Sequence, residues 1–221
     1  MIVKEEPKTL SAKAYDIIEE MIATVKLPPG TIFSEGELAA KIGIGRTPLR
    51  EALLRLSREY LIEMMPRRGV RVTDINLTDQ LALLEVRRVL DRVIAEKAAE
   101  RASKGERKRL LEISERIIAA AKKEDLAEYM KLDAEFDRII AQASRNRFCS
   151  PAVLPLHALC RRFWAYHHLK GDPVRAAKLH SSAMKAIARG NSDAAGKASD
   201  KLIDYLEKFT RSSMDLYSQR T

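Results

Sequence analysis

The chain has 221 residues, of which 46% are hydrophobic and 5% aromatic, so it can bury one large core or two smaller ones, and wholesale disorder is excluded. Its richness in Ala, Leu, Ile, Lys, Arg and Glu favours helices over sheets. The net charge of +9 favours a polyanionic partner, although less of that charge lies in residues 1–73 than in the rest, and an ordinary basic enzyme also fits this composition.

The first predicted elements are two helices separated by a sharp break. Apolar side chains recur at helical spacing over residues 9–25, and Pro28-Pro29-Gly30 then ends that helix. Ser34 and Glu37 have the spacing of a capping box, in which each side chain accepts from the other residue's backbone N–H. We therefore expect a second, short helix that begins there and ends near Ile42.

A third helix is predicted to begin near Arg46 and to place two arginines side by side. Pro48 falls in its first turn, where a missing N–H leaves no hydrogen bond unmade. Arg46 and Arg50 are four residues apart, so they project together from one face. Another face carries a stripe predicted to be buried, made of Leu49, Ala52, Leu53 and Leu56.

Two short strands are predicted at residues 61–65 and 69–73, on either side of the basic turn Pro66-Arg67-Arg68. Three helices followed by such a hairpin can bind DNA, because the third helix fits the major groove and its N-terminal side chains meet base edges. The planar donors of arginine suit guanine edges or phosphates. Arg67 and Arg68 can then reach the neighbouring minor groove, and Gly69 allows close backbone approach.

From residue 77 onward the pattern is entirely helical. The predicted helices span 77–102, 105–122, 125–143, 151–169, 173–189 and 192–213. We therefore expect a mainly α protein with two domains. Residues 1–75 form a winged helix-turn-helix of three helices and a two-stranded wing, and residues 76–221 form an all-α bundle of six to seven helices.

The remaining composition indicates a cytoplasmic location. Cys149 and Cys160 have neither paired spacing nor a surrounding ligand cluster, which is typical of a reduced, cytosolic protein. The first ten residues have no apolar core of a signal peptide, and no apolar run is long enough to span a bilayer. We expect a soluble protein with no membrane partner.

Residues 14–73 resemble the winged helix-turn-helix of GntR-type transcription regulators. The run Gly45-Arg46-Thr47-Pro48-Leu49-Arg50-Glu51-Ala52-Leu53 matches the recognition-helix motif of that family nearly residue for residue. The resemblance implies that a dimer binds operator DNA. It places Arg46, Thr47 and Arg50 at the major groove and Arg67, Arg68 and Gly69 on the wing. Relatives often carry an arginine where this chain has Gly36, so the operator is expected to differ.

The helical part looks like the FadR branch of that family, whose FCD-type domain binds a ligand and dimerises. The resemblance rests on residues 85–91, 132–137 and 179–190. Many members hold zinc or a similar divalent metal with one Asp and three His, a donor set that suits such ions. Carried over by position, the Asp is Asp133, the first His is replaced by Asp137, and the middle His is His180. The last His falls on Leu202, or on Lys201 in a register shifted by one. Two of the four positions are therefore changed, and the residues left for a divalent metal site are Asp133, Asp137 and His180.

The effector-binding candidates are Arg87, Asp91, Arg162 and Tyr166. Arg87 and Asp91 are four residues apart on one helix, so they form either a surface ion pair or an inward pair that binds an acid and a hydroxyl group. Arg162, Trp164 and Tyr166 either line the ligand cavity or belong to the core. Three further histidines show no ligand spacing and stay unassigned: His157, His167 and His168.

The function expected from these features is a ligand-responsive repressor that binds a palindromic operator as a homodimer and changes its DNA affinity on binding a small organic acid. One alternative is an architectural DNA-binding protein without an effector. Another is a metal-dependent helical-bundle enzyme with a DNA-binding appendage. The sequence lacks a nucleophile elbow, a P-loop, a Gly-rich nucleotide motif and the paired Glu-x-x-His motifs of di-iron bundles, so we expect no enzyme activity.

Overall fold

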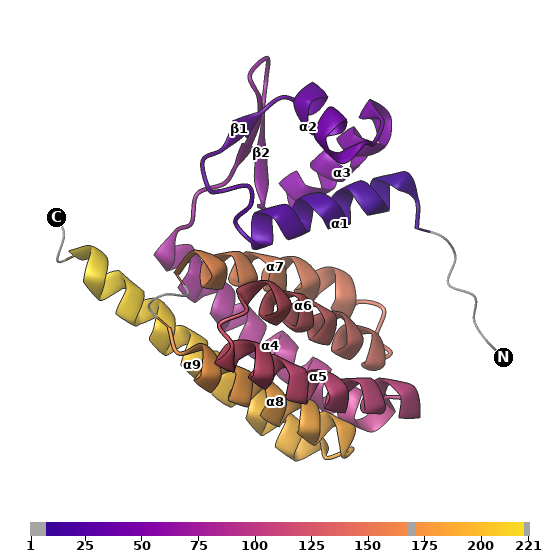
Figure 1. Ribbon diagram of the computed structural model, residues 1–221. Coiled ribbons are helices and arrows are strands. Elements are labelled where there is room, and N and C mark those ends of the chain that lie inside the picture. Colours follow the sequence, from indigo (N-terminus) through magenta and orange to yellow (C-terminus); the bar gives the residue numbers. More distant parts are fainter. Residues whose placement is uncertain (1–7, 168–170, 219–221) are drawn as a thin grey trace. The chain divides into compact units, whose positions relative to one another are not determined.

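The computed structural model describes residues 8–167 and 171–218, and the side chains of residues 8–167 and 171–213 (Figure 1). The chain divides after Ile75 into two compact units, which are described separately below. Both follow the mainly α fold expected from the sequence.

The N-terminal unit contains three helices: α1 (Leu10–Ala23), α2 (Glu35–Ile42) and α3 (Arg46–Arg58). The capping box at the start of α2 is confirmed: the Glu37 backbone N–H donates to Ser34 Oγ over 3.1 Å, and the Ser34 N–H donates to Glu37 Oε2 over 2.9 Å. The helix ends at Gly43, whose φ of 67° is left-handed and suits glycine.

The core of this unit lies between α1 and α3. Ile18 and Ile22 of α1 are fully buried, as is the predicted stripe of α3. That stripe consists of Leu49, Ala52, Leu53 and Leu56. Because this face of α3 is committed to the core, its opposite face is presented to solvent.

The wing is a three-stranded antiparallel sheet of order β1-β3-β2. Strands β2 (Ile62–Met65) and β3 (Gly69–Val72) pair in the predicted hairpin, with Ile62 opposite Val72. The sequence did not indicate β1 (Ile32–Phe33), because two residues are too few for a periodic pattern. It extends the wing by pairing Phe33 with Val70.

The C-terminal unit is a bundle of six helices within the described residues. They are α4 (Leu77–Arg101), α5 (Lys104–Lys122), α6 (Leu126–Ala143), α7 (Cys149–His167), α8 (Pro173–Ala188) and α9 (Ser192–Ser218). The predicted bounds agree within a few residues, although the helix predicted over 151–169 runs partly into residues outside the described ranges. None of the helices in the described part of the chain is both long and apolar enough to cross a membrane.

Helix packing brings polar side chains together in the middle of this bundle. Helix α4 packs on α6, α7, α8 and α9, and α6 also packs on α7 (Figure 1). Most of the interior is aliphatic or aromatic, as the 3.6-residue period requires. Charged and imidazole side chains buried in the same interior are concentrated around one small cavity, and such groups are rarely buried without partners.

Candidate DNA-reading surface and ligand pocket

The first turn of α3 carries the predicted major-groove residues on its exposed side. Arg46, Thr47 and Arg50 are all exposed, while Leu49 between them is fully buried. Gly45 caps the helix without a side-chain hydrogen bond. The Arg50 side chain is 69% exposed, and its Nε lies 3.9 Å from Glu35 Oε1, which is long for an ion pair. Contacts within the unit therefore leave these side chains accessible to a binding partner.

Arg46 lies close to the position at which relatives often have an arginine. A Cβ added to Gly36 would lie 3.8 Å from Arg46 Nη2. A side chain at position 36 would therefore be in van der Waals contact with the Arg46 guanidinium.

The wing tip is a tight turn that exposes two cations. The Arg68 N–H donates to the Met65 carbonyl over 3.1 Å, and Arg67 has a φ of 62°. Pro66 followed by a residue with positive φ is the pattern of a type II turn, whose third position prefers glycine. Arg67 and Arg68 are both exposed. The turn therefore presents two guanidinium groups to solvent at the tip of the wing.

Gly69 is required by the sheet. Its φ is 98°, and an added Cβ would lie 2.5 Å from the carbonyl oxygen of Phe33. Any larger residue would push β1 away from β3, so the structure gives this glycine an internal reason besides the expected approach to DNA.

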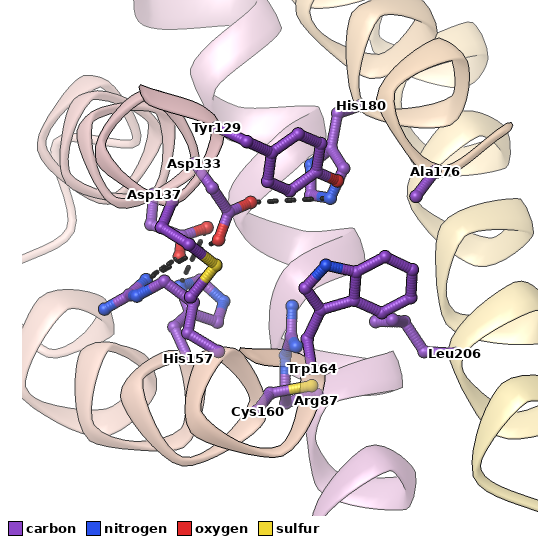
Figure 2. Close-up of a pocket in the computed structure, with 12 residues that line it drawn as sticks. Arg87, Tyr129, Asp133, Asp137, His157, Cys160, Trp164, Ala176, His180 and Leu206 are labelled. Carbon is purple, nitrogen blue, oxygen red and sulfur yellow. Dashed lines mark hydrogen bonds and ion pairs between the residues drawn. The ribbon is translucent and has the colours of Figure 1, made fainter. Parts of the chain in front are cut away.

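The C-terminal unit contains a cavity of about 30 Å³ at the junction of α4, α6, α7, α8 and α9. Figure 2 shows the Asp133 carboxylate between His180 on one side and Asp137 and His157 on the other, with the rings of Tyr129 and Trp164 on the same side as His180. A cavity of this size has room for about one water molecule. The walls combine charged groups with aromatic surface, as small-molecule sites do.

Arg87 and Asp91 form the α4 wall of the cavity region and point inward. Arg87 Nη2 lies 2.8 Å and Nε 3.0 Å from Asp91 Oδ2, and both side chains are less than a tenth exposed. The surface ion-pair interpretation is therefore wrong. Burial opposes the charge on Asp91, but Arg87 and then His157 outweigh it and hold the pKa of that carboxyl below its usual range.

His157 of α7 connects two carboxylates. Its Nε2 lies 2.8 Å from Asp91 Oδ1, and its Nδ1 lies 3.1 Å from Asp137 Oδ1. Burial opposes protonation of the ring, but the charges of Asp137 and Asp91 outweigh it and raise the pKa of His157. The imidazolium form is thus stabilised between the two carboxylates.

Arg161, one turn further along α7, faces the two carboxylates of α6. Its Nη1 donates to Asp137 Oδ2 and lies 4.0 Å from Asp133 Oδ2. His180 Nε2 approaches Asp133 from α8 at 3.4 Å. Burial, together with the charge of Asp137, raises the pKa of Asp133 despite His180 and Arg161, whereas His157 and Arg161 overcome burial and lower the pKa of Asp137.

Buried nitrogens without a hydrogen-bond partner among the described residues lie beside the cavity on α7 and α8. Trp164 Nε1 and His180 Nδ1 are two of them. Trp164 is 6% exposed and His180 is 8% exposed. An indole N–H can only donate, and burying it unpaired costs free energy. Both residues line the cavity, so the pocket presents hydrogen-bonding groups that a small polar ligand can satisfy.

Family models match both units. The model "Bacterial regulatory proteins, gntR family" matches residues 10–72, and the FCD domain model matches residues 82–205, more than half of the chain. The chain belongs to the GntR family and carries an FCD domain.

Individual relatives agree with this assignment. The HTH-type transcriptional repressor RspR of Escherichia coli strain K12 is 22% identical over 204 residues, which cover 91% of this chain and 89% of RspR. An HTH-type transcriptional regulator from Agrobacterium vitis is 30% identical over 136 residues, 60% of this chain and 80% of that protein. The solved structure of E. coli McbR/YncC shares the fold, with a TM-score of 0.80 at 17% identity over 97% of this chain and 100% of that one. The chain is therefore a DNA-binding transcription regulator and not an enzyme.

The FCD cavity corrects part of the predicted effector set. Arg87 lines the cavity, and Asp91 pairs with it. Arg162 is buried but is not among the cavity-lining residues, and Tyr166 is 49% exposed, so the structure does not bring these two side chains to this cavity. A role for them in binding an effector stays a prediction.

The residues that face the cavity from α7 follow the helical period. They are His157, Cys160, Arg161 and Trp164. Their spacing of three and four residues was the available signal for this face, and it was missed because the histidines were compared only with one another. His167 is buried against Phe163, with ring centroids 4.6 Å apart, and His168 lies outside the described residues.

The donor set that the FCD resemblance implies for a metal does not fit one here. Asp133 and Asp137 already face the Arg161 guanidinium. A metal ion bound to these carboxylates would lie close to that guanidinium, and two positive unit charges about 4 Å apart repel by about 4 kcal/mol at an effective dielectric constant of about 20. Leu202 is buried and lines a second small cavity beside Asp137, so the fourth position is apolar. Across the described ranges, no group of three or more His, Cys, Asp or Glu side chains is arranged to hold a metal ion.

Proposed function

We propose that this GntR-family protein is a ligand-responsive repressor that acts in the bacterial cytoplasm and binds a palindromic operator as a homodimer. The observation that carries the proposal is the split character of α3, which buries Leu49 while exposing Arg46, Thr47 and Arg50. Helices that read the major groove use their N-terminal residues in this way. The wing residues Arg67 and Arg68 add phosphate or minor-groove contacts.

A homodimer is supported by an apolar stripe on α4. Val86, Val89 and Val93 follow the helical period, and their exposed fractions are 52%, 64% and 41%. Three exposed β-branched residues on one face favour contact with another protein surface. We propose a second copy of this chain as that partner, because a palindromic operator requires two recognition helices related by a twofold axis.

We propose a small organic acid as the effector, bound in the FCD cavity. The cavity of about 30 Å³ is smaller than any such ligand, so binding must favour an arrangement in which α6, α7 and α8 stand further apart. If that arrangement changes the spacing of the two recognition helices, DNA affinity changes because the half-sites no longer match. The name of RspR, a repressor, supports repression as the direction in which DNA binding acts on transcription.

The test is selection of DNA fragments from the source genome with the purified full chain, followed by footprinting. We expect one preferred site with twofold symmetry, protected by a dimer whose mass is measured by light scattering. Val89→Asp should produce monomers and weaken protection. No preferred site with or without candidate acids would exclude a sequence-specific regulator.

Calorimetry with a panel of organic acids and acyl thioesters separates a regulator from an architectural protein. A regulator binds at least one compound, and that compound changes operator affinity. Saturable DNA binding with no response to any compound would favour the architectural alternative.

A further inference from the structure

The charged groups around the FCD cavity already contain their own cation at the place where a metal would have to lie. Arg161 Nη1 donates to Asp137 Oδ2 and lies 4.0 Å from Asp133 Oδ2, so one guanidinium lies next to both α6 carboxylates. The other Asp137 oxygen faces His157 Nδ1 at 3.1 Å. Both oxygens of Asp137 therefore face nitrogen atoms of α7.

We propose that Arg161 is the permanent cation of this pocket and that the FCD domain of this chain is metal-free. The guanidinium places a positive charge of the protein itself beside the two carboxylates that would have to bind a metal ion.

The placement of the guanidinium supports this assignment. Arg161 donates to Asp137 and lies 4.0 Å from Asp133, so the two α6 carboxylates that would have to bind a metal already face a buried cation. A divalent ion placed beside that guanidinium would add a second buried positive charge next to the first, and this costs free energy. Replacing Arg161 with an uncharged residue would remove that repulsion.

The geometry also identifies what a metal would find once Arg161 is gone. Asp133 and Asp137 of α6 would remain beside the space that the guanidinium occupies, with His157 of α7 against Asp137 and His180 of α8 against Asp133. Carboxylate and imidazole groups in this combination suit zinc and similar ions. Among the described residues these donors are not arranged to hold an ion in the wild type, and removing the guanidinium gives the two carboxylates room to turn toward one.

A consequence for the ligand follows, and this part rests on the proposed function. Without a metal, an acid that enters the pocket is bound by N–H groups of the protein. Trp164 Nε1 has no partner among the described residues and is a donor only, so it meets an acceptor oxygen of the ligand.

The test compares three purified full-length proteins: the wild type, Arg161→Ala and Arg161→Lys. Each is incubated with ZnCl₂, NiCl₂ or MnCl₂, desalted and subjected to elemental analysis, and its melting temperature is recorded with and without each salt. We expect the wild type and Arg161→Lys to retain essentially no metal. Arg161→Ala should retain about one ion per chain of at least one metal, and that ion should raise its melting temperature.

Arg161→Lys is the matched control, because it keeps a cation at the same position. A wild type that retains about one metal per chain after desalting would overturn the proposal, as would a folded Arg161→Ala protein that retains no more metal than the wild type. If circular dichroism shows that Arg161→Ala is unfolded, Arg161→Gln replaces it and the wild-type measurement stands by itself. None of these measurements uses DNA or an effector, so they fail independently of the proposed function.

Discussion

His157 Nε2 lies 2.8 Å from Asp91 Oδ1, in a contact between α7 and α4 that is buried on both sides. Because the other ring nitrogen faces Asp137 of α6 at 3.1 Å, a single imidazole connects three helices of the bundle. The walls of the FCD cavity are therefore held together by electrostatic contacts as well as by packing, and those contacts depend on the protonation of one ring.

The first prediction concerns the pH dependence of stability. Asp91 and Arg87 of α4, Asp137 of α6 and Arg161 of α7 surround His157, whose pKa is raised in the folded protein by Asp137 and Asp91 against burial. The stabilisation is fully present below the unfolded histidine pKa of about 6.5 and is lost as the pH rises through the higher folded pKa.

We expect the melting temperature of the wild type to exceed that of His157→Gln by more at about pH 6 than at about pH 8.5. The comparison with His157→Gln is needed because Asp133, whose pKa is also raised, changes stability in the same direction and is present in both proteins. A difference between the two proteins that is the same at both pH values would show that His157 is neutral in the fold.

The second prediction compares adjacent arginines of α4. Arg87→Met leaves the Asp91 carboxylate buried without its guanidinium partner, and breaking such a pair costs about 3–5 kcal/mol of unfolding free energy. Arg88→Met is the matched control, because Arg88 bonds Asp204 and Glu207 near the surface and such pairs contribute about 1 kcal/mol or less. Chemical denaturation measures both. Equal losses would contradict the buried assignment.

Much of the fold could be predicted from the sequence, because helices are indicated by the spacing of apolar residues and by capping residues at their ends. The Ser34–Glu37 capping box and the stripe of α3 were both predicted, and each depends on residues near one another in the chain. Strand β1 did not follow, because it is defined only by pairing with β3, some forty residues later in the chain. Local patterns cannot indicate a two-residue strand.

The site was harder to predict for the same reason. Arg87 and Asp91 were identified as a pair, but only the packing of α4 against α6 and α7 shows that they are buried. Arg161 was missed because its partners Asp133 and Asp137 lie on another helix, and nothing in the local sequence of α7 indicates them. Tyr166 was chosen for its chemistry, although the helical phase places it on the surface.

The third prediction tests the recognition helix. Arg50→Ala should lower operator affinity by about fivefold to 150-fold, because a good arginine contact to a base is worth about 1–3 kcal/mol. Arg58→Ala, an exposed arginine in the last turn of the same helix, should have little effect. Gel-shift titrations of both dimers at one salt concentration make the comparison. Equal affinities for the two variants would remove Arg50 from the contact surface.

The last prediction separates stability from DNA binding at the wing tip. Arg67 has a φ of 62°, a conformation that costs a non-glycine residue about 1–2 kcal/mol, whereas glycine adopts it freely but loses about 0.5–1 kcal/mol through its more flexible unfolded chain. Arg67→Gly should therefore be as stable as the wild type or slightly more stable. Arg67→Ala keeps the strain and should be the less stable of the two variants.

Both changes remove the same cation, so both should weaken operator binding and flatten its dependence on log salt by about one unit of slope. Arg68→Ala should flatten the slope by a similar amount if Arg68 also meets a phosphate. Melting curves and binding titrations at several salt concentrations provide the two readouts. An Arg67→Gly protein that binds the operator as tightly as the wild type, with an unchanged salt slope, would mean that the left-handed arginine has no role in contacting DNA.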